Sequence, residues 1–235
     1  MMGHVFKKEV GTYFSTPFGF VFMGIFLLLS GLSFTIYNLV GLSGEVAGMF
    51  SLLSNLSFMV FPVLTMRLFA EERRAGTEQV LLNSRLSVAD IVLGKYFAAV
   101  FVLLCCLAVT LIYVGILIRF GFPNLGSVAA SYIGFLLLSM AMIAVCTLAS
   151  SLADNQVTAA IASFGLLFVL VMLNSFTRSV SIPVVTDILS ALSITTRYDE
   201  FVRGIFRPGP VCYYIAFAVV SLFLTVKNME RRRLW

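Results

Sequence analysis

A dense run of charged residues, residues 70–95, separates two strongly apolar parts of the sequence and is the segment most suited to specific chemistry. It is AEERRAGTEQVLLNSRLSVADIVLGK, in which acidic and basic residues lie close together before a Gly-Thr break. A short apolar run and a second candidate helix start follow that break. A connection that only joined two apolar helices could be a handful of polar residues. The segment therefore predicts a docking surface for a soluble partner.

The sequence offers few groups for catalysis of its own. It has no GxxxxGK[ST] phosphate loop, because Gly94-Lys95 is followed by Tyr96 and Ala89 stands where the first glycine belongs. An intramembrane enzyme would need a positioned nucleophile and base, or a metal site. No histidine or carboxylate lies inside any apolar span. We therefore expect no catalytic, cofactor-binding or metal-binding residues, and an intramembrane enzyme is a weak alternative.

An ion-coupled or proton-coupled carrier is a second alternative. Ionisable groups inside membrane spans usually mark the pathways of such carriers. Here the spans contain only neutral polar groups, among them Ser54, Asn55 and Ser57. These three side chains could line a pathway, or they could make hydrogen bonds between helices. The carrier is therefore less favoured than a protein driven by a soluble partner.

The composition indicates a membrane protein. The chain has 235 residues, of which 60% are hydrophobic and 11% charged, and its mean hydropathy is +1.02. Globular proteins have about 25% charged residues, and about 20 apolar residues suffice for a helix to cross the hydrocarbon core. We predict one all-α polytopic domain over residues 1–235. The net charge of +5 does not indicate nucleic-acid binding, because the basic residues flank apolar spans.

Six stretches are long and apolar enough to span a membrane, and basic residues flank them unevenly. The stretches are Phe18–Val40, Val46–Met66, Tyr96–Ile118, Val128–Leu152, Val157–Leu173 and Val211–Val226. Basic residues gather before the first span, between the second and third, and after the last. With an even number of spans these three groups share one side, which the positive-inside rule assigns to the cytoplasm. We expect a bacterial cytoplasmic-membrane protein with both termini inside.

Two further segments have helical periodicity without being spans. In residues 1–17 one apolar face comprises Val5, Phe6, Val10, Tyr13 and Phe14, and Pro17 ends the pattern. This predicts an amphipathic helix in the cytoplasmic membrane interface. In the extracytoplasmic segment 174–210, apolar residues recur near a 3.6-residue period, which predicts an amphipathic helix on the outer surface. Its apolar face comprises Ile188, Leu192, Tyr198, Phe201, Val202 and Ile205.

The charged segment 70–95 contains two candidate helix starts. Thr77 can cap a short helix that has Glu78 in its first turn. Ser87, followed by Asp90, resembles a capping box that starts a helix continuing into the third span. A push on the short helix would then move that span. Alternatively, these charges only set the topology and form a solvated face.

The same residues resemble the cytoplasmic loop of ABC-2 type transporter permeases. The resemblance rests on EERRAGTEQVLLNS, residues 71–84, and DIVLGKY, residues 90–96. Near the far end, Tyr198, Phe201, RGI at 203–205, YY at 213–214 and FLT at 223–225 resemble the gliding-motility-associated branch. The resemblance to these permeases covers nearly the whole chain. The sequence departs from the family pattern at Arg85-Leu86, where many relatives have a proline. It implies six spans, an N-terminal interface helix, a coupling helix between spans two and three, and outer helices between spans five and six.

The resemblance also implies partners and roles for particular residues. Two permeases, identical or homologous, would dimerise around a pathway, and each would contact an ABC ATPase subunit that carries ATP and Mg. The ATPase-coupling residues would be Lys7, Lys8, Glu71, Glu72, Arg73, Arg74, Gly76, Thr77, Glu78, Ser87 and Asp90, with Glu72 and Glu78 as exposed charges. An outer gate or partner contact would comprise Tyr198, Phe201, Arg203 and Gly204. Uncharged spans favour export of an amphiphilic or envelope-related substrate, with a second permease that has an extracytoplasmic domain.

The predicted topology can be tested by labelling single cysteines in sealed cells. We expect Gly76→Cys and Glu230→Cys to react only with reagents that reach the cytoplasm, because both positions lie beside the basic groups. Arg203→Cys should react from outside. Labelling of positions 76 and 203 from the same side would exclude the six-span arrangement.

Overall fold

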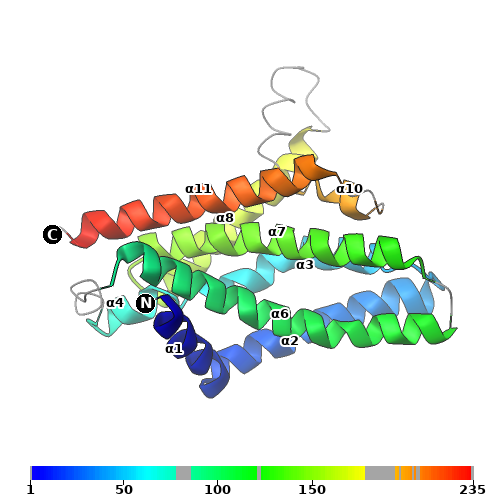
Figure 1. Cartoon of the computed structure of the whole chain (residues 1–235), viewed down its shortest axis with the longest axis horizontal. Coiled ribbons are helices and arrows are strands. Elements are labelled where there is room, and N and C mark those ends of the chain that lie inside the picture. The colour runs from blue at the N-terminus through cyan, green and yellow to red at the C-terminus, as the bar shows by residue number, and fades with distance from the viewer. Residues whose placement is uncertain are drawn as a thin grey trace.

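The computed structural model describes residues 2–77, 86–120, 123–177, 194–195, 197–202, 204 and 207–233, with 174–177 described only as backbone. Every regular element in these ranges is a helix. They are α1 (Met2–Ser15), α2 (Pro17–Phe34), η1 (Thr35–Val40), α3 (Ala47–Thr65), α4 (Ala70–Arg74), α6 (Val88–Phe120), α7 (Leu125–Leu152), α8 (Gln156–Thr177), α10 (Tyr198–Val202) and α11 (Pro208–Arg233). Six helical stretches are long and apolar enough to cross a membrane, and they form an elongated bundle (Figure 1). The chain is a multi-pass membrane protein.

The six predicted spans coincide with these six stretches, although some helices extend further than their apolar parts. The helix α6 begins at Val88, well before the predicted span start at Tyr96, and has 33 residues. Such a helix is about 50 Å long, whereas the hydrocarbon core is about 30 Å thick. One or both ends of α6 must therefore extend beyond the hydrocarbon core if the helix crosses it without a strong tilt.

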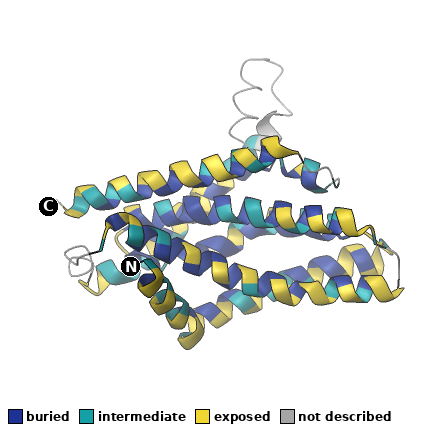
Figure 2. Ribbon diagram, viewed as in Figure 1, coloured by how far each residue is buried: buried dark blue, intermediate teal, exposed yellow. Residues whose placement is uncertain are grey.

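The helix α7 forms the centre of the bundle. Of its most apolar window, 72% is buried, compared with at most 50% for any other span. It packs against α3, α6, α8, α10 and α11, and Figure 2 shows exposed residues concentrated on the outer helices. Its buried face is rich in small residues, which allow helices in a membrane to approach closely. These include Ser131, Gly134, Ser139, Ala141, Ala144 and Ser150.

The last part of the first span is π-helical rather than α-helical. The element η1 continues α2 without a break, ends at Val40 and is followed by Gly41. Leu42 follows with a φ of 50°, in the left-handed region that a branched side chain rarely adopts. Such π-helical turns are rare and often lie at functional sites. No feature of the sequence predicted this change of winding.

The N-terminal segment forms α1, which ends before Pro17 as expected. Val5 and Tyr13 are buried, and Phe6 and Val10 pack against the core. Phe14 was expected on the same face, but its side chain is 39% exposed. The position of α1 relative to a membrane surface stays a prediction.

The predicted outer helix is described only in part. The helix α10 contains Tyr198, Phe201 and Val202. Ile188, Leu192 and Ile205 lie outside the described residues, so the longer amphipathic helix stays a prediction. The side chain of Phe201 packs against α7 at Gly134, where a Cβ atom would collide with the Phe201 side chain. A glycine at position 134 is therefore required for this contact.

We predict that Gly134→Val lowers the melting temperature of the purified chain in detergent, because the added side chain must displace Phe201. Overpacking of this kind costs about 1–3 kcal/mol. The matched control is Gly165→Val in α8, where a Cβ atom meets nothing within 4 Å. Equal melting temperatures for the two variants would show that the contact between α10 and α7 does not contribute to stability.

Candidate functional site

One end of the bundle gathers most of the charged side chains discussed above. The N-terminal helix α1, the short helix α4, the start of α6 and the end of α11 all lie there (Figure 1). We call it the charged end. Six residues form the charged cluster at this end: Glu9, Arg67, Glu71, Glu72, Arg73 and Lys95. The other end, where η1, the end of α6 and the start of α7 lie (Figure 1), is called the opposite end.

Lys95 of α6 is the buried centre of the charged cluster. Its Nζ lies 2.9 Å from Oε1 of Glu9 in α1 and 2.9 Å from Oε1 of Glu72 in α4, while its side chain is only 2% exposed. Its Nζ also lies 5.5 Å from the centre of the Phe69 ring. A buried ammonium without partners would carry a large desolvation cost. One cation therefore holds three helices together through two carboxylates.

Close packing of α1 on α6 brings Glu9 within reach of Lys95. At Gly94 an added Cβ atom would lie 2.9 Å from the Val5 side chain. Val5, Glu9 and Tyr13 are spaced four residues apart, so they share one face of α1. Glu9 is therefore a carboxylate on the apolar, inward face of this helix.

Arg67 makes a second connection at the charged end, between α4 and the junction of α1 and α2. Its Nε and Nη2 donate to the two carboxylate oxygens of Glu71, at 2.6 and 2.7 Å. Its Nη1 donates to the Thr16 hydroxyl at 3.1 Å, and its guanidinium lies over the Phe18 ring at 4.5 Å. Bidentate arginine–carboxylate pairs fix geometry as well as charge. The turn between α1 and α2 is thus attached to the segment that leads into α4.

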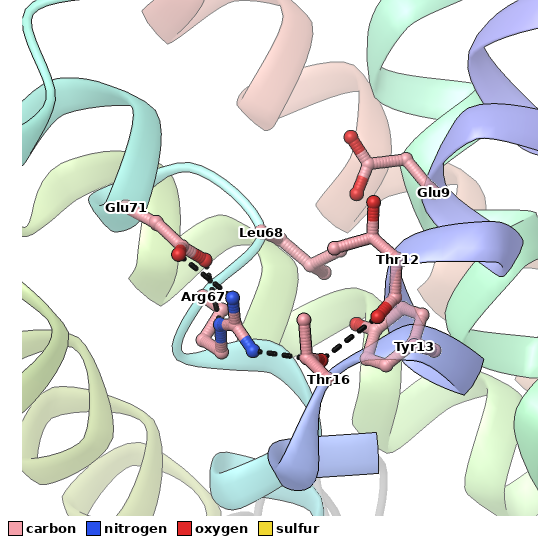
Figure 3. A pocket seen from close by; sticks show the side chains of 7 residues that line it. All are labelled: Glu9, Thr12, Tyr13, Thr16, Arg67, Leu68 and Glu71. Atoms are coloured by element: carbon pink, nitrogen blue, oxygen red, sulfur yellow. Dashed lines mark hydrogen bonds and ion pairs between the residues drawn. The ribbon is translucent and has the colours of Figure 1, made fainter.

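A small cavity lies between these two connections (Figure 3). It is lined by Glu9, Thr12, Tyr13, Thr16, Arg67, Leu68 and Glu71 and has a volume of about 20 Å³, which is room for one water molecule. The Tyr13 hydroxyl donates to the Leu64 carbonyl at 2.8 Å. Burial raises the pKa of Tyr13, so this phenol stays protonated and keeps its donor. The cavity is too small for a cofactor.

Arg73 attaches α4 to the end of α7. Its Nη1 donates to the Ala153 carbonyl, and its Nη2 donates to the Ser151 carbonyl at 3.0 Å. Asn228 of α11 also donates to the Ser151 carbonyl, at 2.9 Å. The last carbonyls of a helix have no partners within it, and a cation there also interacts favourably with the helix dipole. The end of the central helix is therefore held by both α4 and α11.

The arrangement suits mechanical linkage better than catalysis. Through Lys95, Arg67 and Arg73, the segment around α4 is connected to α1, α6 and α7. In the described ranges, no three His, Cys, Asp or Glu side chains gather in a way that could hold a metal ion. A displacement of α4 would be transmitted to several helices at once.

The predicted coupling residues divide into a paired group and an exposed group. Glu71, Glu72 and Arg73 belong to the charged cluster. The others that the structure describes include exposed Lys7, Lys8, Arg74, Gly76, Thr77 and Ser87, and partly exposed Asp90. Ser87 caps α6 as predicted, because its hydroxyl accepts from the Asp90 N–H at 3.0 Å. Glu78 lies outside the described residues, so the helix expected after Thr77 stays a prediction.

Glu72 requires a correction. It was expected to be an exposed docking charge, but its side chain is only 17% exposed and is paired with Lys95. Sequence reasoning also did not single out Glu9, Arg67 and Lys95, which belong to the same cluster. The position of Glu9 on the apolar face of α1 was an available signal, since a carboxylate on such a face needs a partner.

The residues expected at an outer gate are mostly buried within the chain. Tyr198 is 2% exposed and Phe201 is fully buried, so neither side chain presents a surface to a partner in this structure. Gly204 ends α10 with a φ of 73°, and its N–H donates to the Phe201 carbonyl at 3.0 Å. Arg203 lies outside the described residues.

Comparison with known proteins identifies a family for most of the chain. A family model described as ABC-2 family transporter protein matches residues 41–226. This range contains α3 to α8 and α10, and most of α11. It therefore includes every member of the charged cluster except Glu9. No curated protein matches the chain.

We predict that Lys95→Met strongly destabilises the chain, because it leaves Glu9 and Glu72 buried without their shared cation. Removing one partner of a buried ion pair costs about 3–5 kcal/mol. The measurement is the melting temperature in detergent. Lys227→Met is the matched control, since its ion pair with Glu230 is exposed and such pairs contribute about 0–1 kcal/mol.

Adding Glu9→Gln and Glu72→Gln to Lys95→Met should restore much of the lost stability, because no uncompensated charge remains. If Lys95→Met has the same melting temperature as the Lys227→Met control, the ion pairs of Lys95 do not hold these helices together.

Proposed function

Because the chain belongs to the ABC-2 transporter family and is an ABC transporter permease subunit, we propose that it couples ATP hydrolysis by separate ATPase subunits to export of an amphiphilic or envelope-related substrate. The observation that supports this most is the charged cluster, which connects an exposed tip to the core of the bundle. ATP and Mg would be bound by the partner ATPase. The permease would contribute the pathway and the moving helices.

The ATPase would dock at the tip formed by Arg74, Gly76 and Thr77. All three residues are exposed and lie within four positions after Arg73 of the charged cluster. Lys7 and Lys8 are exposed on α1 at the same end, and Glu78 would belong to the same surface. The basic residues of this end support a cytoplasmic location under the positive-inside rule. Exposed charges of this kind affect encounter and specificity more than the fold.

Movement of the docked ATPase would reach the spans through the paired residues. A push on the tip displaces α4, and Lys95 makes α1 and the start of α6 follow it. Arg73 would transmit the same displacement to the end of α7, the most buried helix of the bundle. ATP binding would shift these elements, and hydrolysis would reset them.

The pathway would form where a second permease, identical or homologous, covers α3 and α8. Ser54, Asn55 and Ser57 each bond to a carbonyl of their own helix, at 2.7–2.9 Å, rather than to another helix. Asn55 is exposed although it lies within an apolar span, and Met59 is exposed one turn later. Phe164 and Phe168 are exposed on the neighbouring α8. An apolar wall with few amides and hydroxyls suits an amphiphile better than an ion.

The finer assignments are part of the same proposal. The resemblance to the gliding-motility-associated branch supports a second permease subunit with an extracytoplasmic domain. The segment 174–210 would lie where such a domain or an outer gate acts. Because Tyr198 and Phe201 are buried against α7, they would position this segment rather than contact the partner.

We predict that Lys7→Glu combined with Arg74→Glu abolishes co-purification with the ATPase and leaves the melting temperature of the permease unchanged. Both side chains are exposed, so their reversal changes docking rather than packing. Glu72→Lys should instead lower the melting temperature, because it places a second cation beside buried Lys95. The matched control is Arg231→Glu with Arg233→Glu, which also reverses two exposed charges at this end. Normal ATPase binding by the Lys7 and Arg74 variant would contradict this docking site.

A further inference from the structure

A second cavity lies at the opposite end of the bundle, far from the charged cluster. It has a volume of about 350 Å³ and lies between η1 with the turn after it and the last turns of α6. Its lining is mainly apolar and includes Phe34, Leu39, Ile116 and Leu117. Ligand sites are typically cavities of about 300–1,000 Å³ with apolar walls and a few placed polar groups. Its size and lining fit that description.

Asn38 supplies the placed polar group of this cavity. It lines the cavity, and its side-chain Nδ2 donates to the carbonyls of Ser43, at 2.8 Å, and Glu45, at 3.0 Å. A carbonyl can only accept, so these two bonds fix which way the amide is turned. The other amide atom, Oδ1, is buried and has no hydrogen-bond donor in the described part of the chain. Asn38 as a whole is only 6% exposed.

An unpaired buried amide oxygen is costly, and the backbone beside it is also held in an unfavourable form. An unsatisfied buried acceptor costs about 1–3 kcal/mol. The same turn contains a π-helical segment and Leu42 in the left-handed region. Such costs concentrate at sites where the geometry serves a ligand. Both features occur at the wall of one cavity.

We propose that this cavity binds an amphiphile that has an apolar chain and a hydrogen-bond donor, such as a hydroxyl or amine, at its head. The chain would lie against Phe34, Ile116 and Leu117. The head would enter beside Asn38 and displace the lining enough to donate to Oδ1, which is buried in this structure. The donor requirement follows from the fixed amide, because an acceptor at the head would leave Oδ1 unpaired.

The occupant comes from the surrounding membrane leaflet and stays bound as a lipid. Three residues of the lining, Leu39, Leu42 and Phe120, are 55%, 89% and 85% exposed, so the cavity is open at these residues. None of the lining residues named here belongs to α3 or α8, which carry the surface proposed for the pathway. The inference does not depend on the proposed ATP-driven export.

The test uses the full chain in phosphatidylcholine nanodiscs and a hexadecanol probe with a photoreactive diazirine in its chain. A second probe is the methyl ether of the same alcohol, which lacks the donor. Mass spectrometry locates the labelled peptides. We expect the alcohol to label residues 34–44 and 116–120, and the ether to label them about fivefold less, the factor that one neutral hydrogen bond supplies.

Two substitutions make the result specific to the cavity. Leu39→Trp fills the cavity without removing Asn38 and should abolish the difference between the probes. Leu32→Trp is the matched control, because Leu32 has a similar exposure of 51% but does not line the cavity. Equal labelling by alcohol and ether in the unmodified chain, or unchanged labelling in Leu39→Trp, would overturn the site.

A last arm separates a resident lipid from transported cargo. In the complex with the ATPase, labelling by the alcohol should stay the same during ATP turnover. A fall to background during turnover would identify the occupant as cargo and overturn its assignment as a resident lipid. Failure of the complex to form would leave the labelling of the chain alone unaffected, so the two proposals can fail separately.

Discussion

The arrangement of the charged end depends on one buried cation. Lys95 can be buried only because Glu9 and Glu72 each place a carboxylate oxygen 2.9 Å from its Nζ. Each carboxylate comes from a different helix, so the position of α1 and the position of α4 are both fixed relative to α6. Buried ion pairs often add little net stability, because desolvation offsets the attraction, but in some proteins they specify which elements meet. Such specificity would suit the coupling role proposed for this end of the bundle.

The ion pairs of Lys95 are connected to the rest of the bundle through α6 and α4. The helix α6 continues from Lys95 through the membrane, and Arg73 connects α4 to the last carbonyls of α7. Since α7 is the most buried span, its displacement would also move most of the helices packed against it. The exposed tip at Arg74 and Thr77 is short, but α4, which precedes it, is connected to several spans through these contacts.

Much of the fold follows from the sequence, whereas much of the site does not. Apolar length located all six spans, and the Ser87 cap correctly marked the start of α6. Hydropathy alone placed Lys95 among the topology signals, because the pattern of one segment does not show that Glu9, 86 positions earlier, lies against it. For the same reason Glu72 was expected to be exposed. The π-helical winding of η1 and the unpaired Oδ1 of Asn38 also arise from tertiary packing, which local propensity does not encode.

Under the proposed coupling, α1, α4 and the start of α6 would move as one unit when the ATPase acts. Spin labels at positions 8, 75 and 89 report on these three elements, and double electron–electron resonance measures the distances between them in the complex with its ATPase. We expect the three distances to be the same with and without ATP, and to change with ATP once Lys95→Met is introduced. A nucleotide-dependent change in the distance between positions 8 and 75 of the unmodified chain would contradict it.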